Sequence, residues 1–355
     1  METYLAKIKI KKQRGFCPAA FMAYKIEMGT AMKLKKIFVL GLALCISICM
    51  MSGCKKKNEK KEVQTSGKLN VVTTIYPYYD FVKNIAGDKV NLSLITPAGE
   101  DMHSFKPDST TMSEVLKADV LVYNGGESEK WIDDLFNVKK DEAKNIKKIS
   151  MLENASEILS VLNEQDESKD DSVTASADSG NYDEHLWTAP LCAEKIVNII
   201  KDKLSEYDKK NAEYYGNNAD EYNKKLEQLD YEFREVVENG NTKHVVFADR
   251  FSLKYLFDEI GLVYSAAYPV CAEYQAPKKQ TVLYLEKRIR EEKLPVIFKN
   301  EITNSGIAEK IAKKTGADVE VFNTCHTVTQ KQFEEGVSYI EIMNSNVDKL
   351  KKALE

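Results

Sequence analysis

Short runs of β-branched and aromatic residues alternate with helical stretches, and this alternation limits the fold of the 355-residue chain more than any other feature. A first set of predicted strands covers Leu69–Ile75, Val90–Ile95, Val120–Tyr123 and Ile146–Ser150. A second set covers Val245–Phe247, Leu262–Tyr268, Val296–Phe298 and Val319–Phe322. Strands that alternate with helices favour βαβ units, so the pattern predicts an α/β protein with two separate sheets.

The stretch between the two strand sets has no proline and few helix breakers beyond Gly216. A helix of about thirty residues is roughly 45 Å long, which is enough to run along both sheets. We therefore predict an N-terminal lobe at residues 68–207, a linking helix at 208–239 and a C-terminal lobe at 240–355. A closing helix is expected from about Gln330 to Leu350.

The N-terminal segment indicates export from the cytoplasm. Three lysines after Met32 precede an uncharged run from Ile37 to Met51, and small residues then precede Cys54. This order predicts a signal peptide at residues 32–53, because the apolar run is too short to span a bilayer comfortably. The alternative is a short membrane anchor. Residues 1–31 are interpreted as an upstream extension.

The four letters that end at Cys54, MSGC, resemble the lipobox of bacterial lipoproteins. That resemblance implies a lipid on Cys54 and a protein held at the outer face of the cell membrane. Residues 54–67 are almost entirely polar and predict a flexible tether, and residues 163–183 predict an acidic surface loop within the N-terminal lobe.

Charge excludes one class of partner. The first 53 residues hold nine basic and two acidic residues of the chain's 51 and 55, so the remainder has 42 basic and 53 acidic residues and a net charge of about −11. An acidic body argues against nucleic-acid binding and is compatible with cations.

Three of the four histidines lie where a metal site is expected. His103, His185 and His326 each occupy a short polar segment before a predicted helix, and two of them follow predicted strands. Residues at the carboxyl ends of parallel strands meet at one crevice, and neutral imidazoles are preferred zinc ligands. These residues therefore predict a metal in the cleft between the lobes. His244, beside Lys243, fits an ordinary hydrogen-bonding role instead.

Four segments carry a resemblance to a known family. They are Val71–Tyr76 before Pro77, PAGEDMHSFKP at 97–107, DEHLWTAP at 183–190 and CHTVTQKQFEEGVSYIEIM at 325–343. Together, and in this order, they resemble the zinc and manganese solute-binding lipoproteins of ABC importers. The resemblance implies two α/β lobes, a rigid linking helix, a metal in the cleft, and a permease and its ATPase as partners.

The resemblance also suggests metal ligands. His103 and His185 match the first two ligand positions of the family. The third family ligand falls near the segment FADRF, where this chain departs from the family because Ala248 stands before Asp249. His326 lies near the position of the last family ligand and is assigned by its location and its chemistry. The fourth ligand stays open, with Glu301 as the first candidate.

Asp249 is the alternative fourth ligand, although a buried ion pair in the lobe interface suits it equally. Three imidazoles and one carboxylate favour Zn²⁺ over Mn²⁺, which prefers more oxygen ligands. Outside the cell a disulfide between Cys271 and Cys325 is permitted.

The sequence thus predicts a monomeric, extracytoplasmic receptor that captures Zn²⁺ or Mn²⁺ for an ABC importer and that is not an enzyme. A metal-dependent surface adhesin is the main alternative. A metallohydrolase is less favoured, because the chain has no His-Glu-x-x-His motif and no nucleophile elbow.

Overall fold

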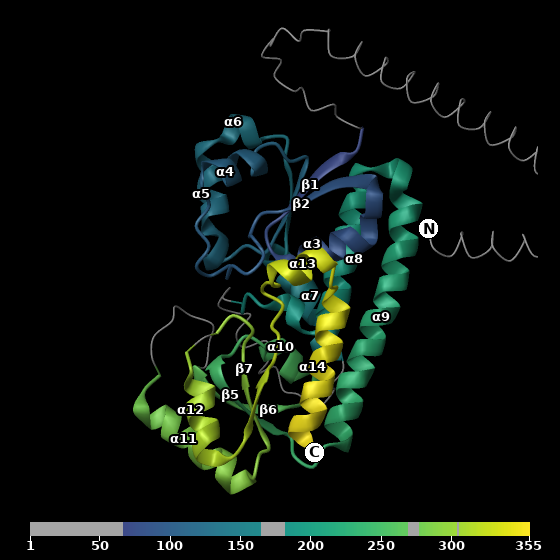
Figure 1. Cartoon of the computed structure of the whole chain (residues 1–355). Helices are drawn as coiled ribbons and strands as arrows, with labels where there is room; N and C mark the ends of the chain where they lie inside the picture. Colours follow the sequence, from purple (N-terminus) through teal and green to yellow (C-terminus); the bar gives the residue numbers. More distant parts are fainter. Residues whose placement is uncertain (1–66, 165–181, 269–276, 304) are drawn as a thin grey trace, which may run out of the picture. The chain divides into compact units, whose positions relative to one another are not determined.

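Eight strands form two parallel sheets with the same topology (Figure 1). The first sheet has the order β2-β1-β3-β4, and the second has the order β6-β5-β7-β8. Neighbouring strands in both sheets are parallel. The strands are β1 (Leu69–Thr73), β2 (Val90–Leu94), β3 (Val120–Tyr123), β4 (Lys147–Ser150), β5 (His244–Arg250), β6 (Val263–Tyr268), β7 (Val296–Lys299) and β8 (Asp318–Val321).

The computed structural model describes residues 67–164, 182–268, 277–303 and 305–355, which belong to one unit, Ser66–Glu355. The described helices of the N-terminal lobe are α3 (Tyr76–Ala86), α4 (Ser109–Val115), α5 (Lys130–Val138), α6 (Lys140–Ala143), α7 (Ala155–Glu164) and α8 (Pro190–Tyr207). The later helices are α9 (Ala212–Asn239), α10 (Lys254–Ile260), α11 (Lys279–Glu292), α12 (Ile307–Thr315), α13 (Gln330–Glu335) and α14 (Tyr339–Leu354). Short 3₁₀ turns lie at Gly87–Lys89 (η1), Glu127–Glu129 (η2), Leu152–Asn154 (η3), Leu186–Thr188 (η5) and Lys209–Asn211 (η6).

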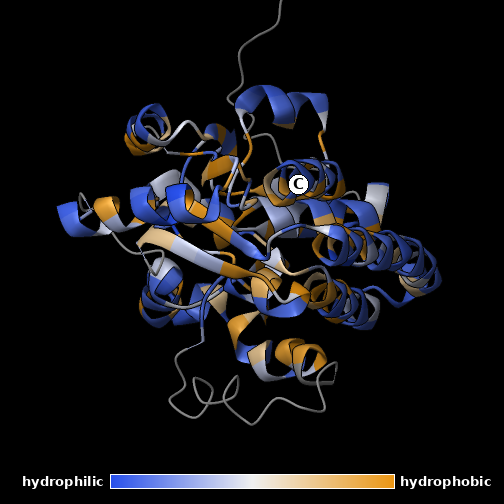
Figure 2. Cartoon of the chain, turned by 90° about the horizontal axis from the view of Figure 1, so that it is seen from below, coloured by the Kyte–Doolittle hydropathy of each residue, from blue (hydrophilic) through white to orange (hydrophobic). Residues whose placement is uncertain are grey.

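Alternate residues of each sheet enter different cores, as the two-residue period of a strand requires. One large core contains strand residues of both lobes, namely Val71, Val120, Val122, Ile149, Val245, Phe247, Val296 and Phe298. The opposite faces form smaller cores, with Val72, Leu121 and Tyr123 in one lobe and Val246, Ala248 and Ile297 in the other. Figure 2 shows hydrophobic residues on the strands and on one side of most helices. The two lobes are therefore joined through a continuous apolar core.

The helix α9 holds the two lobes along one side (Figure 1). It packs against α3 and α8 of the N-terminal lobe and against α10 and α14 of the C-terminal lobe. Its buried residues recur at helical spacing along its whole length: Tyr215, Ala219, Tyr222, Leu226, Leu229, Phe233 and Val237. A 28-residue helix is about 42 Å long, so the predicted fold of two α/β lobes with one long linking helix is confirmed.

Two predicted helix boundaries were wrong. The linking helix begins at Ala212, because α8 ends at Tyr207 and the short turn η6 follows it. The predicted closing helix is two helices, because Gly336 takes a left-handed conformation with φ 72° and ends α13. Ser338 then starts α14 through a capping box with Glu341. The eight predicted strands are all present, with ends shifted by a few residues.

Several predictions lie outside the described residues. These are the upstream extension at 1–31, the signal peptide at 32–53, the tether at 54–66 with Cys54, and most of the acidic loop at 163–183. Among the residues that the structure describes, no helix is both long and apolar enough to cross a membrane.

Candidate metal centre

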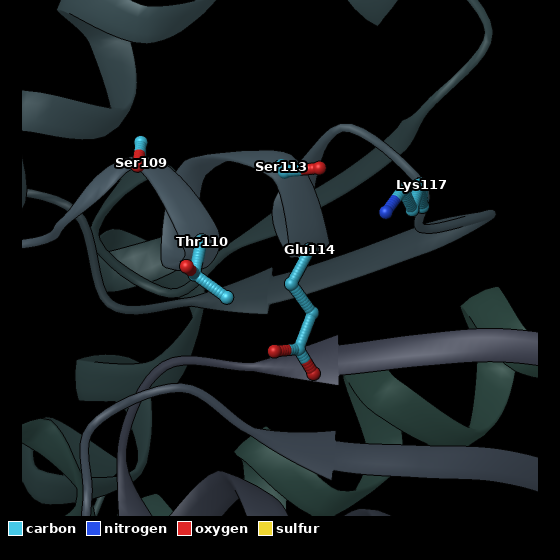
Figure 3. A pocket seen from close by; sticks show the side chains of 5 residues that line it. All are labelled: Ser109, Thr110, Ser113, Glu114 and Lys117. Carbon is cyan, nitrogen blue, oxygen red and sulfur yellow. The ribbon is translucent and has the colours of Figure 1, made fainter.

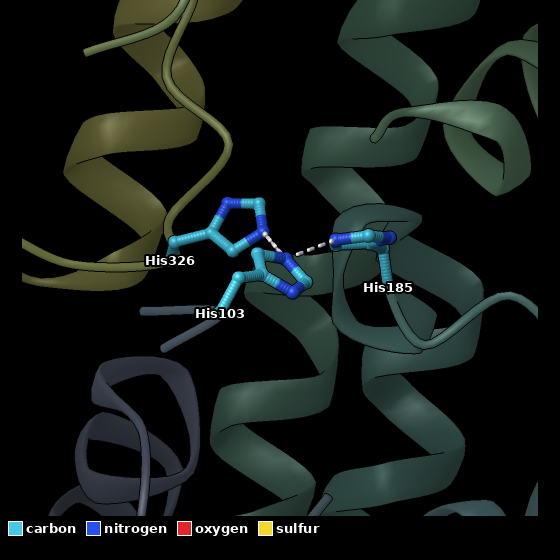
Figure 4. Close-up of side chains that lie close together, drawn as sticks. All are labelled: His103, His185 and His326. Atoms are coloured by element: carbon cyan, nitrogen blue, oxygen red, sulfur yellow. Dashed lines mark hydrogen bonds between the residues drawn. The ribbon is translucent and has the colours of Figure 1, made fainter. Parts of the chain in front are cut away.

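The three predicted imidazole ligands come together at one point (Figure 4). His103 lies in the loop between β2 and α4, His185 immediately precedes η5 and α8, and His326 lies between β8 and α13. His103 Nε2 is 3.2 Å from His185 Nε2 and 3.2 Å from His326 Nε2. One ligand atom from each residue lies within 4.8 Å of the other two. Three segments far apart in the sequence thus converge on a space the size of one metal ion.

The other ring nitrogen of His185 is held by a carboxylate. Asp183 Oδ1 lies 2.6 Å from His185 Nδ1 and also accepts the His185 backbone N–H at 2.9 Å. Burial acts to raise the pKa of Asp183, and the hydrogen bond and charge of His185 outweigh it, so the pKa lies below its usual value. An ionised Asp183 accepts the Nδ1 proton and leaves the Nε2 lone pair facing the other imidazoles.

His103 reaches a carboxylate through one hydroxyl group. Its Nδ1 is 2.7 Å from Ser128 Oγ, and Ser128 Oγ donates to Glu184 Oε2. Glu184 Oε1 also accepts the Glu127 backbone N–H at 2.6 Å, which holds the carboxylate at the start of η2. Because the hydroxyl donates its only proton to Glu184, it can accept one from His103 Nδ1. The Nε2 lone pair of His103 then faces Nε2 of His185 and Nε2 of His326.

His326 is oriented in the same way from the C-terminal lobe. Its Nδ1 contacts Thr324 Oγ1, which donates to Glu301 Oε1 at 2.9 Å. The backbone N–H of Thr324 donates to the other Glu301 oxygen at 2.9 Å. Each imidazole is therefore linked through Nδ1 to a carboxylate, directly or through one hydroxyl. This is the arrangement that fixes the tautomer of a metal-binding histidine.

Burial and charge keep His326 neutral. It is 1% exposed, and its pKa lies well below 6.5 because of burial first, and then because of repulsion by His185, His103 and Arg250. His185 is 3% exposed, whereas His103 is only partly buried. A neutral imidazole is the form that binds a metal, so a proton at His326 is a weak competitor for the metal.

Glu301, the first candidate for a fourth ligand, is not brought to the imidazole cluster. Both of its carboxylate oxygens accept hydrogen bonds from Thr324, and burial raises its pKa against those hydrogen bonds. The structure thus gives Glu301 the role of supporting His326 through Thr324. This corrects the prediction of a direct ligand.

Asp249, the alternative ligand, is also outside the cluster. It is 1% exposed, and its two oxygens accept the backbone N–H groups of Arg250 at 2.7 Å and of Asn300 at 3.1 Å. Those contacts fasten the end of β5 to the end of β7. The ion pair in this region is formed by Arg250 with Asp101 of the other lobe.

The indole of Trp187 packs against two of the imidazoles. Its ring centroid lies 5.4 Å from that of His185 and 5.3 Å from that of His326. Trp187 Nε1 donates to the carbonyl oxygen of Thr324 at 2.9 Å, so one buried side chain ties the segment after His185 to the segment before His326.

Sequence reasoning missed the residues that support the imidazoles. Asp183 could have been found, because an acidic residue two positions from a candidate ligand is a simple signal. Ser128 and Glu184 could not, since no local pattern links residue 128 to a histidine at 103.

Cys325 is a buried free thiol, 1% exposed, and burial raises its pKa well above 9.0. Its proposed disulfide partner, Cys271, lies outside the described residues, so the bridge stays a prediction.

A separate shallow pocket of about 470 Å³ lies on α4 and is lined by Ser109, Thr110, Ser113, Glu114 and Lys117 (Figure 3). All five side chains come from one short helix and the residues at its end, and none is an imidazole or a thiol. The imidazole cluster is therefore the better candidate for a metal site.

Comparison with known proteins agrees with this geometry. The family described as zinc-uptake complex component A, periplasmic (ZnuA), matches residues 71–353. The chain belongs to this family. Members of the ZnuA family are solute-binding proteins, so the prediction that the chain is not an enzyme is confirmed.

Individual ZnuA relatives match most of the chain. The high-affinity zinc uptake system protein ZnuA of Bacillus subtilis (strain 168) is 29% identical over 307 residues, which cover 86% of this chain and 94% of that protein. The crystal structure of the Zn(II)-bound ZnuA-like domain of Streptococcus pneumoniae AdcA has a TM-score of 0.65 at 26% identity, covering 81% of this chain and 99% of that one. The metal-dependent lipoprotein YcdH from Bacillus subtilis has a TM-score of 0.65 at 28% identity, with coverage of 81% and 99%.

Proposed function

We propose that this protein binds Zn²⁺ outside the cytoplasm through His103, His185 and His326 and delivers it to an ABC importer. The observation that carries the proposal is the convergence of three Nε2 atoms whose Nδ1 partners are already in place. Such a site needs little rearrangement to accept the ion. The names of its relatives, a zinc uptake protein and a Zn(II)-bound domain, support the same cargo.

The donor set favours zinc over manganese. Zinc is commonly held by imidazoles in tetrahedral sites, whereas manganese suits carboxylate, carbonyl and water oxygens. Glu301 and Asp249 are occupied elsewhere, so three imidazole nitrogens are the donors that the described residues bring together. One position of a tetrahedral ion is left for a further ligand.

Capture and delivery follow from where the ligands lie. His103 and His185 belong to the N-terminal lobe, and His326 follows β8 of the C-terminal lobe, so the bound ion bridges both lobes. A permease that separates the lobes slightly would pull His326 away from the ion and leave the ion with the two imidazoles of the N-terminal lobe, which weakens its binding. We infer that the protein acts as a monomer, held to the membrane by a lipid on Cys54, with a permease and its ATPase as partners. Membership of the ZnuA family disfavours the metallohydrolase alternative, and the surface-adhesin alternative gains nothing from the imidazole site.

Isothermal titration with Zn²⁺ tests the proposal directly. The wild-type protein should bind one ion, and His103→Ala should weaken binding by about 10²–10³-fold, the share of one ligand in a typical zinc site. His244→Ala is the matched control, because His244 contacts Glu292 and Ser265 instead of the cluster. Equal zinc affinity in the wild type and His103→Ala would reject the proposed site.

A further inference from the structure

The loop that carries His103 is fastened to the opposite lobe by two polar contacts. Asp101 Oδ2 lies 2.7 Å from Arg250 Nη2, and the backbone N–H of Gly99 donates to Thr327 Oγ1 at 2.9 Å. Arg250 is the last residue of β5, and Thr327 directly follows His326. A loop of the N-terminal lobe is therefore positioned by residues of the C-terminal lobe.

Asp101 connects that contact to the candidate ligand. Its Oδ1 accepts the backbone N–H of His103 at 3.0 Å, while its Oδ2 contacts Arg250. The carbonyl oxygen of Asp101 also accepts the N–H groups of Ser104 and Phe105, each at 3.0 Å. The turn around His103 is thus built on Asp101, so the orientation of this carboxylate decides where the imidazole lies.

Arg250 is a rigid anchor for Asp101. It is 8% exposed and pairs with Tyr268 at the end of the sheet. Its backbone N–H donates to Asp249 at 2.7 Å, and its carbonyl oxygen accepts from Asn300 Nδ2 at 2.9 Å. The backbone is therefore held on both sides, so the guanidinium extends from a fixed point.

The charges of this pair also matter to a cation. Arg250 contacts Asp101, two residues before His103, so its positive charge lies close to the proposed ion. A fixed positive charge beside a divalent cation is unfavourable unless an anion neutralises it. The carboxylate of Asp101, 2.7 Å from the guanidinium, supplies that anion.

We propose that Arg250 is a positioning residue for metal capture, which acts by holding Asp101 and, through it, His103 opposite the other two imidazoles. The segment FADRF, where the resembling family has a ligand, thus serves the site from Arg250, two positions after Ala248. This inference rests on the proposed function, because it assumes that His103 binds the ion. It also makes the ligand geometry depend on the relative position of the two lobes.

Zinc affinity of paired variants, measured by competition with a chromophoric chelator, tests this role. Arg250→Met should weaken binding about 10-fold, as loss of supporting residues around a metal commonly does. Asp101→Asn should weaken it more, about 100-fold, because it loosens His103 and also leaves the guanidinium unneutralised. The double variant should bind about as well as Arg250→Met, since removal of the cation abolishes the second penalty. Arg250→Lys keeps the charge without the planar fork and should be intermediate.

Two further measurements separate positioning from folding. Arg288→Met is the control, because Arg288 forms a comparable ion pair with Glu292, at 2.6 Å, within α11. The visible absorption of bound Co²⁺ should change in Arg250→Met and not in Arg288→Met, because it reports the geometry of the ligands. Thermal unfolding of the metal-free variants checks that each one folds. If Arg250→Met does not fold, Arg250→Lys takes its place in the affinity measurements.

The inference is overturned if Arg250→Met and Asp101→Asn both bind zinc within about twofold of Arg288→Met, or if their effects simply add in the double variant. That result, with His103→Ala still deficient, would leave the proposed zinc site standing. A wild-type protein that binds zinc no better than His103→Ala would instead remove the proposed function itself.

Discussion

The two lobes have the same strand order and contribute to the site in different ways. The N-terminal lobe supplies two imidazoles, one buried and one partly exposed, on the loop after β2 and on the segment before α8. The C-terminal lobe supplies one imidazole after β8, and at the end of β5 it places Arg250 instead of a ligand. The same topology therefore fixes where strand exits meet, while the residue at each exit decides whether that lobe presents an imidazole or, in the role proposed for Arg250, a group that positions one.

Two buried glutamates, one in each lobe, are accommodated differently. Glu129 of the N-terminal lobe is 4% exposed, and burial raises its pKa to about 7, although its Oε2 accepts the backbone N–H of Gly125 at 2.8 Å. Glu286 of the C-terminal lobe is equally buried and forms an ion pair with Lys314. Ionisation of Glu129, which lies beside Ser128, is thus unfavourable in the folded protein, whereas the carboxylate of Glu286 has a cation as its partner.

The largest expected effect tests whether the single imidazole of the C-terminal lobe is essential. His326→Ala should weaken zinc binding by about 10²–10³-fold, as much as His185→Ala, because each removes one of three equivalent nitrogen donors. Zinc should then raise the unfolding temperature of the wild type and leave that of both variants unchanged. Differential scanning calorimetry with and without zinc provides the measurement. Normal zinc stabilisation of His326→Ala would place the site in the N-terminal lobe alone.

The second prediction concerns stability and pH. A carboxyl with a raised pKa in the folded state loses stability as pH rises from its unfolded value of 4.5 through about 7. Glu129→Gln should therefore be more stable than the wild type above pH 7, by about 3 kcal/mol, and equal to it below pH 4.5. Denaturant unfolding of the metal-free protein at several pH values measures this difference.

Glu286→Gln is the matched control in the other lobe. It removes one ion pair with a half-exposed lysine and should change the free energy of unfolding by less than about 1 kcal/mol, with no gain at high pH. A Glu129→Gln protein without any pH-dependent gain would contradict the difference between the lobes.

The smallest expected effect compares the carboxylates that orient the imidazoles. Asp183→Asn should weaken zinc binding about 10-fold or more, because Asp183 contacts His185 Nδ1 directly. Glu301→Gln should weaken zinc binding less, because Thr324 lies between Glu301 and His326 and keeps its contact with His326 Nδ1. Competition titrations at one pH rank the two variants. The reverse order would show that His326 depends on its carboxylate more than His185 does.

Much of the fold followed from local sequence. All eight strands were predicted. The central strands β3 and β5 are buried along their whole length, and the outer strands are short β-branched runs between helical stretches, so both kinds are visible in the chain. The start of α9 was missed by four residues, and the division into α13 and α14 was missed altogether, because each depends on backbone conformations near Asp208 and Gly336 that periodicity does not report.

Local sequence also predicted the histidines of the candidate site, but not the contacts of its carboxylates. His103, His185 and His326 were found because strand exits converge in a parallel sheet and imidazoles are rare in this chain, which has four. Glu301 and Asp249 were assigned by proximity to strand ends, which does not reveal which backbone N–H or hydroxyl a carboxylate accepts from. In the structure, both oxygens of each carboxylate accept hydrogen bonds from groups outside the imidazole cluster.

The sequence by itself determined the alternating elements, the two lobes and the three histidines, because strand burial, helix periodicity and ligand chemistry act over a few neighbouring residues. Only the tertiary structure decided which oxygen holds each Nδ1, that Arg250 reaches Asp101 across the lobes, and that Glu301 contacts Thr324 instead of the imidazole cluster. Those contacts join residues tens to hundreds of positions apart, and their geometry depends on ångström-scale packing of the whole chain.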